Sequence, residues 1–236
     1  MKYLFLACSV LLLFITACSL NDYDNYDTPD AIFEGNIVYE GDPIPVGYNS
    51  VSFELWQSGF GKETPIDVTV AQDGSFSAKL FSGKYRLVLK EDQGPYLSPT
   101  NTETNSDSIM VDLNGNKSSD IEVLPYYMIR NASFSISDRN VSASFEVEKI
   151  MDSENGGKPV ESVSLYISKT QFVDERTSIS SNIVAATEIS DMSNININTD
   201  VPELTPEQGY IFARVGVKIV DVEDMLFSNV EKIQLN

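Results

Sequence analysis

Apolar and polar residues alternate with a period of two along most of the chain from Ala31 onward, and this pattern restricts the fold more than any other feature. Successive side chains of a β-strand point to opposite faces, so the alternation predicts strands with one buried face. The clearest runs lie at residues 51–56, 66–70, 76–80, 85–90, 109–113, 132–136, 141–147, 163–168, 195–197, 210–220 and 224–235. At most a short helix fits residues 171–176. The pattern predicts an all-β chain of antiparallel sandwiches.

Turn-forming residues divide the strands into two series. Asp73-Gly74 and Asn114-Gly115 predict hairpin turns within the first series. Pro125 interrupts the alternation, and Tyr126-Tyr127 follow it, so we place a domain boundary at this point. The prediction is therefore an N-terminal sandwich over residues 31–125 and a C-terminal sandwich over residues 126–236. Each is long enough to bury a core of its own.

Residues 1–17 predict a signal peptide that belongs to neither sandwich. Lys2 precedes an uncharged apolar stretch that is shorter than the ~20 residues a membrane-spanning helix needs. The stretch ends in Ile15-Thr16-Ala17-Cys18, which resembles a bacterial lipobox. The resemblance implies cleavage before Cys18, lipidation of its sulfur, and attachment to a membrane through this lipid anchor alone. An ordinary secretory signal is the alternative interpretation.

Residues 18–30 are polar and acidic and have no periodicity, so they predict a flexible tether between the anchor and the first strand. Acidic residues directly after a lipidated cysteine also resemble the surface-export signal of Bacteroidetes lipoproteins.

Charge and residue counts exclude several classes of function. The chain carries 35 Asp and Glu against 16 Lys and Arg, a net charge of −19, which argues against nucleic acid as a partner. It has no histidine, so Ser-His-Asp and Cys-His catalysis and imidazole-based zinc sites are ruled out. Its two cysteines, Cys8 and Cys18, fall in the signal peptide and at the lipidation point. Residues 112–116 fit a turn better than a calcium loop, because the bidentate glutamate is missing. We expect a protein that is not an enzyme, without catalytic residues, metal or cofactor.

Trp56 is the one tryptophan of the chain and the first candidate for a ligand-binding side chain. Strand parity places it on the outer face of the first sandwich, beside Glu54. An exposed indole offers a flat apolar surface for a sugar ring, with polar groups next to it. We expect Phe60, in the following loop, and Tyr96, in the long loop 91–107, to lie at the same edge and to complete a glycan-binding surface with Trp56. The alternative is that Trp56 packs against the second domain or covers a loop.

Two groups of motifs resemble known sandwich domains. Gly35, the Pro43 turn, Asp73-Gly74-Ser75-Phe76 and Gly83-Lys84-Tyr85 follow the order seen in carboxypeptidase-regulatory-like (transthyretin-like) domains. In the second half, the segment from Leu204 to Tyr210 resembles the E–F corner of fibronectin type III domains, which are Ig-like sandwiches. In that corner a tyrosine hydroxyl hydrogen-bonds back to the backbone. The resemblance implies that Tyr210 forms a structural tyrosine corner.

The order of motifs along the chain resembles one group, the two-domain lipoproteins of gut Bacteroidetes encoded beside Sus-type glycan-import systems. The resemblance rests on residues 24–30, on Gly35, Gly74 and Tyr85, on Pro125-Tyr126-Tyr127 and on residues 213–217. It implies a lipid-anchored location in the outer membrane, at the cell surface. It also implies an accessory role in capturing and importing a polysaccharide or oligosaccharide, with Sus-type transporter proteins as partners. The alternative is a structural spacer or protein–protein adaptor of an import complex, without a ligand of its own.

Overall fold

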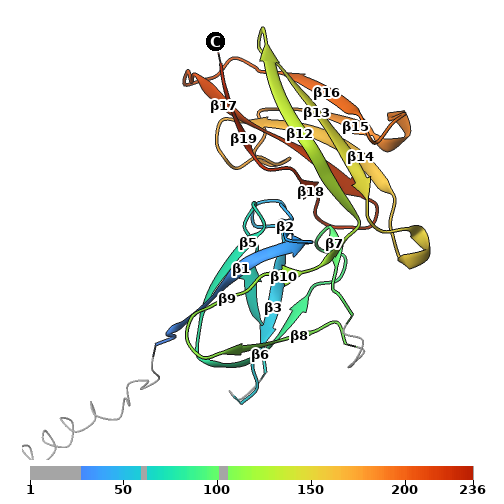
Figure 1. The fold of residues 1–236 in the computed structure, drawn as a ribbon. Helices are drawn as coiled ribbons and strands as arrows, with labels where there is room; N and C mark the ends of the chain where they lie inside the picture. Colours follow the sequence, from blue (N-terminus) through green and yellow to red (C-terminus); the bar gives the residue numbers. More distant parts are fainter. Residues whose placement is uncertain (1–27, 60–62, 101–105, 236) are drawn as a thin grey trace, which may run out of the picture.

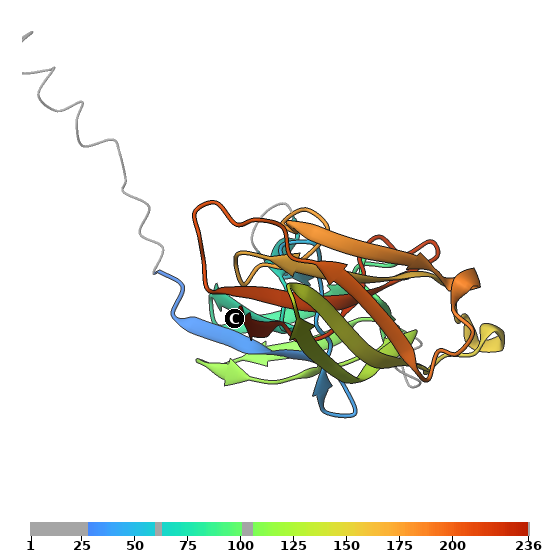
Figure 2. The same ribbon diagram turned by 90° about the horizontal axis from the view of Figure 1, so that it is seen from above.

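The computed structural model describes residues 28–59, 63–100 and 106–235, which form two β-domains stacked end to end (Figures 1 and 2). Within these residues, no helix is long and apolar enough to cross a membrane. The predicted signal peptide, Cys18 and Phe60 lie outside the described residues. The prediction of an all-β chain with two tandem sandwiches is confirmed.

The N-terminal domain packs two sheets against each other. Its strands are β1 (Ala31–Tyr39), β2 (Asp42–Pro43), β3 (Ser52–Trp56), β4 (Ile66–Thr69), β5 (Ser75–Leu80), β6 (Gly83–Leu89), β7 (Tyr96–Leu97), β8 (Ile109–Leu113), β9 (Lys117–Ser118), β10 (Ile121–Glu122) and β11 (Leu124–Pro125). One sheet has the antiparallel order β4-β3-β6-β8. The other is built around β1, which pairs antiparallel with β2 and β5 and parallel with β9 and β10. Phe33, Phe53 and Phe76 meet in the core, with ring centroids 5.0 and 5.1 Å apart.

The two turns predicted as hairpins connect different sheets instead, so that prediction is wrong. Asp73-Gly74 links β4 of one sheet to β5 of the other, and Asn114-Gly115 links β8 to β9 in the same manner. Gly74 has φ +87°, and Asp73 Oδ1 accepts hydrogen bonds from Ser75 N (3.1 Å) and Ser75 Oγ (2.7 Å). The turn itself can be predicted from its own residues. Which strand pairs with which depends on β1, which is distant in sequence.

The C-terminal domain is a second sandwich. Its strands are β12 (Tyr127–Ser137), β13 (Asn140–Lys149), β14 (Val160–Ser168), β15 (Ser180–Ala185), β16 (Ile195–Asp200), β17 (Tyr210–Ile219), β18 (Leu226–Phe227) and β19 (Glu231–Gln234), with one-turn 3-10 helices η2 (Ser153–Asn155) and η3 (Ala186–Glu188). One sheet has the order β12-β13-β16, and in the other β15, β14 and β17 are followed by β18 and β19, which both pair with β17. Residues 171–176 form a bend and turn, so the short helix expected there is absent from the described structure.

The structure places a tyrosine corner in the first domain, and the prediction for Tyr210 is wrong. Within the described residues the Tyr210 hydroxyl makes no hydrogen bond, and the ring packs edge-on against Phe212, with centroids 5.7 Å apart. Ile211 and Ala213 occupy the inward positions of β17, so Tyr210 faces outward. The Tyr85 hydroxyl instead donates to the carbonyl of Phe81, four residues upstream, at 2.8 Å. This is the backward hydrogen bond that defines such a corner.

The loop between β17 and β18 ties the two domains together through backbone hydrogen bonds. The amides of Glu223 and Asp224 donate to the carbonyls of Asp92 (2.8 Å) and Gln93 (2.9 Å), and Phe227 N donates to Pro45 O at 3.1 Å. Two ion pairs cross the same boundary, Lys158–Asp92 at 2.6 Å and Arg130–Asp42 at 2.7 Å. Backbone bonds fix direction as well as distance, so these contacts hold the domains in one relative orientation.

Asp174 organises a second contact between the domains. Its side chain is only 6% exposed and accepts hydrogen bonds from Arg176 Nη2 (2.7 Å) and from the Thr177 hydroxyl and amide (both 3.0 Å). Arg176 in turn donates to the Tyr48 carbonyl and to Ser50 Oγ of the N-terminal domain. Burial alone would raise the pKa of Asp174, but the hydrogen bonds from Arg176 and Thr177 outweigh it and hold the pKa below 3.8.

We expect Asp174→Asn to lower the free energy of unfolding at pH 7 by about 1–3 kcal/mol, because a charged acceptor of several hydrogen bonds is lost. The folded-state pKa lies below the unfolded value, so this contribution is complete above pH 3.8 and is lost as the pH falls through the folded pKa. The difference between wild type and variant should therefore shrink in acid, as measured by urea unfolding at a series of pH values. Asp112→Asn, an exposed substitution on β8, is the control and should show little difference at any pH. A constant difference for Asp174→Asn would contradict the assignment.

Candidate ligand-binding site

Trp56 stands at the end of β3 on the outer face of the β4-β3-β6-β8 sheet. Along β3, Phe53 and Leu55 are buried, while Ser52, Glu54 and Trp56 are partly exposed on the opposite face. The strand begins beside the C-terminal domain, because Ser52 N donates to the side chain of Gln93, whose carbonyl accepts from Asp224. Trp56 therefore lies at the far end of the strand, and the alternative of packing against the second domain is wrong.

Three side chains form a row across neighbouring strands on this face. Arg86 of β6 is the register partner of Trp56, and Met110 of β8 is the register partner of Arg86. The Arg86 guanidinium carbon lies 5.6 Å from the centroid of the Trp56 ring, within range of a cation–π contact. Met110 is 67% exposed. We call Trp56, Arg86, Met110 and the adjacent Glu54 the outer-face cluster.

Glu54 fixes the orientation of the indole. Trp56 Nε1 donates to Glu54 Oε2 at 2.9 Å, between residues that are neighbours on the same face of the strand. The indole N–H is thus satisfied while the ring remains partly exposed. Charge on this sheet face is balanced, since Glu54, Asp67 and Asp112 are matched by Lys84, Arg86 and Lys90, in a chain whose net charge is −19. Lys90 pairs with Asp67 at 2.7 Å. The face can stack a ring and hydrogen-bond its substituents.

Tyr96 does not belong to this cluster, so the prediction for that residue is wrong. It is only 4% exposed, and burial raises the pKa of its hydroxyl. Pairing of β7 with β11 sets Tyr96 opposite Pro125 and turns the ring inward, close to Gly94 and near Asp224 of the second domain. A side chain so covered offers no surface to a sugar. Phe60, the third predicted residue, lies outside the described residues.

Sequence reasoning missed Arg86 and Met110. Alternation alone places both on an outward face, but it does not say which strands are neighbours. Only the β3–β6–β8 register brings them into line with Trp56. Among the residues that the structure describes, no group of three or more acidic or thiol side chains is arranged to hold a metal ion.

Comparison with known proteins identifies both domains. The model of the DUF3823 N-terminal domain, a family described as proteins of unknown function, matches residues 31–124, and that of the DUF3823 C-terminal domain matches residues 127–232. Crystal structures of DUF3823 family proteins from Bacteroides ovatus and Parabacteroides merdae are each 30% identical to this chain. They cover 88% of it and 100% of their own length, with TM-scores of 0.76 and 0.75.

A candidate carbohydrate-binding protein from Bacteroides uniformis shares the fold at 15% identity, with a TM-score of 0.67 and coverage of 88% of this chain and 100% of its own. No curated protein sequence matches the chain significantly. The two family models together span almost all of both sandwiches, and the chain therefore belongs to the DUF3823 family.

Proposed function

We propose that this protein is a non-catalytic, lipid-anchored protein of the outer membrane that binds a polysaccharide or oligosaccharide on its outer-face cluster. The observation that carries the proposal is Trp56, an indole held by Glu54 on an outer sheet face and bordered by the donors of Arg86. An apolar ring face beside a carboxylate and a guanidinium matches the alternating C–H and hydroxyl surfaces of a sugar. The candidate carbohydrate-binding protein with the same two-domain fold agrees with this proposal.

The proposed anchor is Cys18, at the end of the lipobox-like segment, and the proposed partners are Sus-type transporter proteins of the outer membrane. The protein would then serve as an accessory in glycan capture and uptake, with residues 18–30 as the tether.

The test is binding of a panel of plant and host polysaccharides to the chain from Ser19 to Asn236. Because Trp56 is the sole tryptophan, a saturable fluorescence change reports on this one place. Trp56→Ala should weaken binding in affinity gels at least about tenfold, the equivalent of about 1.4 kcal/mol, without changing the unfolding temperature by more than a few degrees.

Ile183→Ala is the matched control, because Ile183 is an apolar side chain 55% exposed on β15 of the other domain. It should bind like wild type. If Trp56→Ala retains the full affinity for a polysaccharide that wild type binds, the site is assigned wrongly.

A second candidate function, docking of a protein partner, is favoured by Met110. Trp, Arg and Met are enriched at protein interfaces, and an exposed methionine adds little to sugar recognition. The first residue of β1 pairs with the last residue of β5, and β6, which carries the partner of Trp56, begins three residues later. β1 therefore starts at the same end of the domain as Trp56, and the tether joins it there. A partner in the membrane could meet the face there. Met110→Ala should then reduce sugar-independent capture of a transporter subunit more than it reduces polysaccharide binding.

A further inference from the structure

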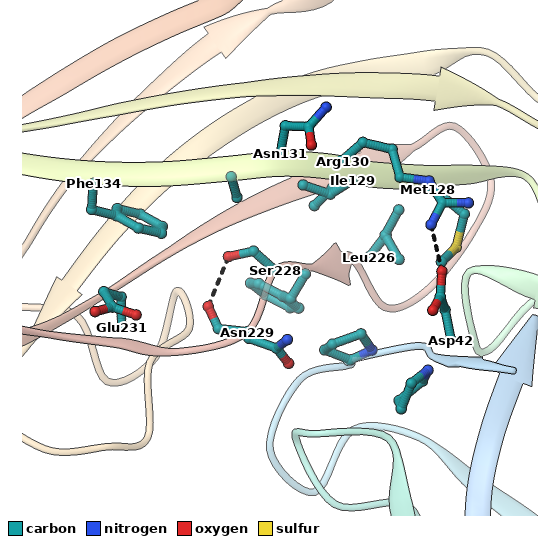
Figure 3. Close-up of a pocket in the computed structure, with 14 residues that line it drawn as sticks. Asp42, Met128, Ile129, Arg130, Asn131, Phe134, Leu226, Ser228, Asn229 and Glu231 are labelled. Carbon is teal, nitrogen blue, oxygen red and sulfur yellow. Dashed lines mark hydrogen bonds and ion pairs between the residues drawn. The ribbon is translucent and has the colours of Figure 1, made fainter.

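A groove of about 390 Å³ runs along one side of the C-terminal domain, between β12 and β18, and ends against the β2 segment of the N-terminal domain (Figure 3). We call it the edge groove. The outer-face cluster lies in the N-terminal domain, and none of its residues lines the edge groove. The role of the groove is therefore independent of the proposed function.

The walls of the edge groove are backbone edges. Two runs of consecutive residues line it: residues 129–132 in β12, and residues 226–229, which comprise β18 and the two residues after it. β12 is the end strand of its sheet, so its side away from β13 is a sheet edge, and a bulge between Arg130 and Ser133 brings consecutive residues to it. Within the described residues, β12 pairs only with β13, and β18 only with β17. The amides and carbonyls of β12 that point away from β13 therefore have no strand partner within the described residues.

Proteins normally protect such an edge with lysine, proline or a bulge. A bulge does interrupt the β12–β13 register between Arg130 and Ser133, where Asn131 has φ +54°. Beyond it the register is regular from Ser133 to Ser137, and residues 131–137 include no charged side chain and no proline. This part of the edge is open to pairing with another strand.

The groove has an apolar middle and acidic ends. Phe134, Ile129 and Leu226 line its length, with Glu231 toward one end and Asp42 at the other (Figure 3). Arg130, the cation of the groove, is bound by Asp42 and Glu148, each at 2.7 Å. Glu231 makes no ion pair within the described residues. The ends therefore present excess negative charge.

We propose that the edge groove binds an extended segment of a partner protein, which adds to β12 as a further strand. Main-chain hydrogen bonds to the free edge would supply affinity, and alternate apolar side chains would enter the middle of the groove. Lysine or arginine at the ends of the segment would face Glu231 and Asp42. A second copy of this chain fits the acidic ends less well, because its net charge is −19. The tether also fits less well, because its residues 22, 24, 27 and 30 are all aspartate.

The probe is a fluorescein-labelled peptide of nine residues that alternates valine and threonine and carries lysine at both ends. Fluorescence anisotropy with the chain from Ser19 to Asn236 should show binding at least about tenfold tighter than that of the same peptide with glutamate at both ends. Amides within residues 129–137 should become protected from hydrogen exchange. Glu231→Lys should weaken the lysine-ended peptide about fivefold or more and strengthen the glutamate-ended one.

Glu188→Lys, the same charge change in η3 at the other side of the sandwich, is the control and should leave both affinities within about twofold of wild type. Failure of the lysine-ended peptide to bind, equal binding of both peptides, or protection outside β12 would overturn the proposal. Concentration-dependent dimers that Glu231→Lys dissociates would assign the groove to a second copy instead, and tighter peptide binding after deletion of residues 19–30 would assign it to the tether. Trp56→Ala should not change peptide binding, so this test stands apart from the glycan test.

Discussion

Arg214→Ala is expected to lower the free energy of unfolding by about 3 kcal/mol or more and to separate the unfolding of the two domains. Arg214 lies on β17 and has no exposed surface. Its guanidinium donates to the carbonyls of Ser228 (2.8 Å) and Val173 (3.3 Å) in its own domain. It also donates to those of Val46 and Gln72, both at 2.9 Å, in the N-terminal domain.

The substitution would leave the carbonyls of Ser228, Val173 and Val46 without this donor, which costs more than the hydrogen bonds themselves contribute net, whereas the Gln72 carbonyl would keep the Val46 amide at 3.3 Å. Burial lowers the pKa of Arg214 to about 9, against the attraction of Asp224, Asp174 and Asp73, so the side chain remains charged at pH 7. The guanidinium also lies over Phe227, 4.1 Å from the ring centroid. It therefore acts as a planar connector between the two domains.

Scanning calorimetry tests this prediction. Wild type should unfold in one transition, whereas Arg214→Ala should show two, with the first at a lower temperature. Arg214→Lys should recover only part of the loss, because a single ammonium cannot reach four carbonyls in two domains. Lys79→Ala, at an exposed position of β5, is the control and should behave like wild type. A single transition at the wild-type temperature for Arg214→Ala would refute the role of this side chain.

Gly35→Ala is expected to destabilise the N-terminal domain by about 3 kcal/mol, through crowding of one backbone against another. A methyl group at position 35 would lie 2.2 Å from the carbonyl oxygen of Ser119 and 3.1 Å from Phe76 Cζ. Ser119 cannot simply withdraw, because its amide donates to the carbonyl of Glu34 at 2.9 Å. Relief of the clash would break the parallel pairing of β1 with β9 and β10.

Urea unfolding of the two variants Gly35→Ala and Gly209→Ala provides the comparison. Apart from its two chain neighbours, a methyl group at position 209 would meet no atom of the described residues within 4 Å, so that variant should unfold at nearly the wild-type midpoint. The midpoint for Gly35→Ala should fall markedly at an unchanged slope. Equal midpoints for the two variants would contradict the prediction, because they would show that the segment around Ser119 moves aside with little loss of stability.

Much of the architecture follows from local pattern. Alternation along single strands is enough to predict an all-β chain, and the inward residues Phe53, Leu55, Val111 and Leu113 are buried as parity requires. Trp56 points outward for the same reason. The assignments of the first domain to the carboxypeptidase-regulatory-like fold and of the second to the fibronectin type III fold stay predictions.

Long-range pairing is beyond such local signals. Asp73-Gly74 has the composition of a hairpin turn and makes a sheet-to-sheet corner, because β5 pairs with β1 and not with β4. Tyr96 belongs to a polar loop in the sequence and is buried once β7 meets β11. In each case the deciding partner is many residues away, and its register is not encoded in the segment itself.

The sequence by itself determined the strand content, the two series of strands and the outward side of Trp56, since all three depend on side-chain periodicity within one segment. The tertiary structure alone decided which strands are neighbours, and so placed Arg86 and Met110 beside Trp56. It also decided the environment of Arg214, which occupies the polar parity of β17 between Ala213 and Val215. That parity predicts exposure to solvent, but the N-terminal domain covers this face and supplies two of the four carbonyls that bind the guanidinium.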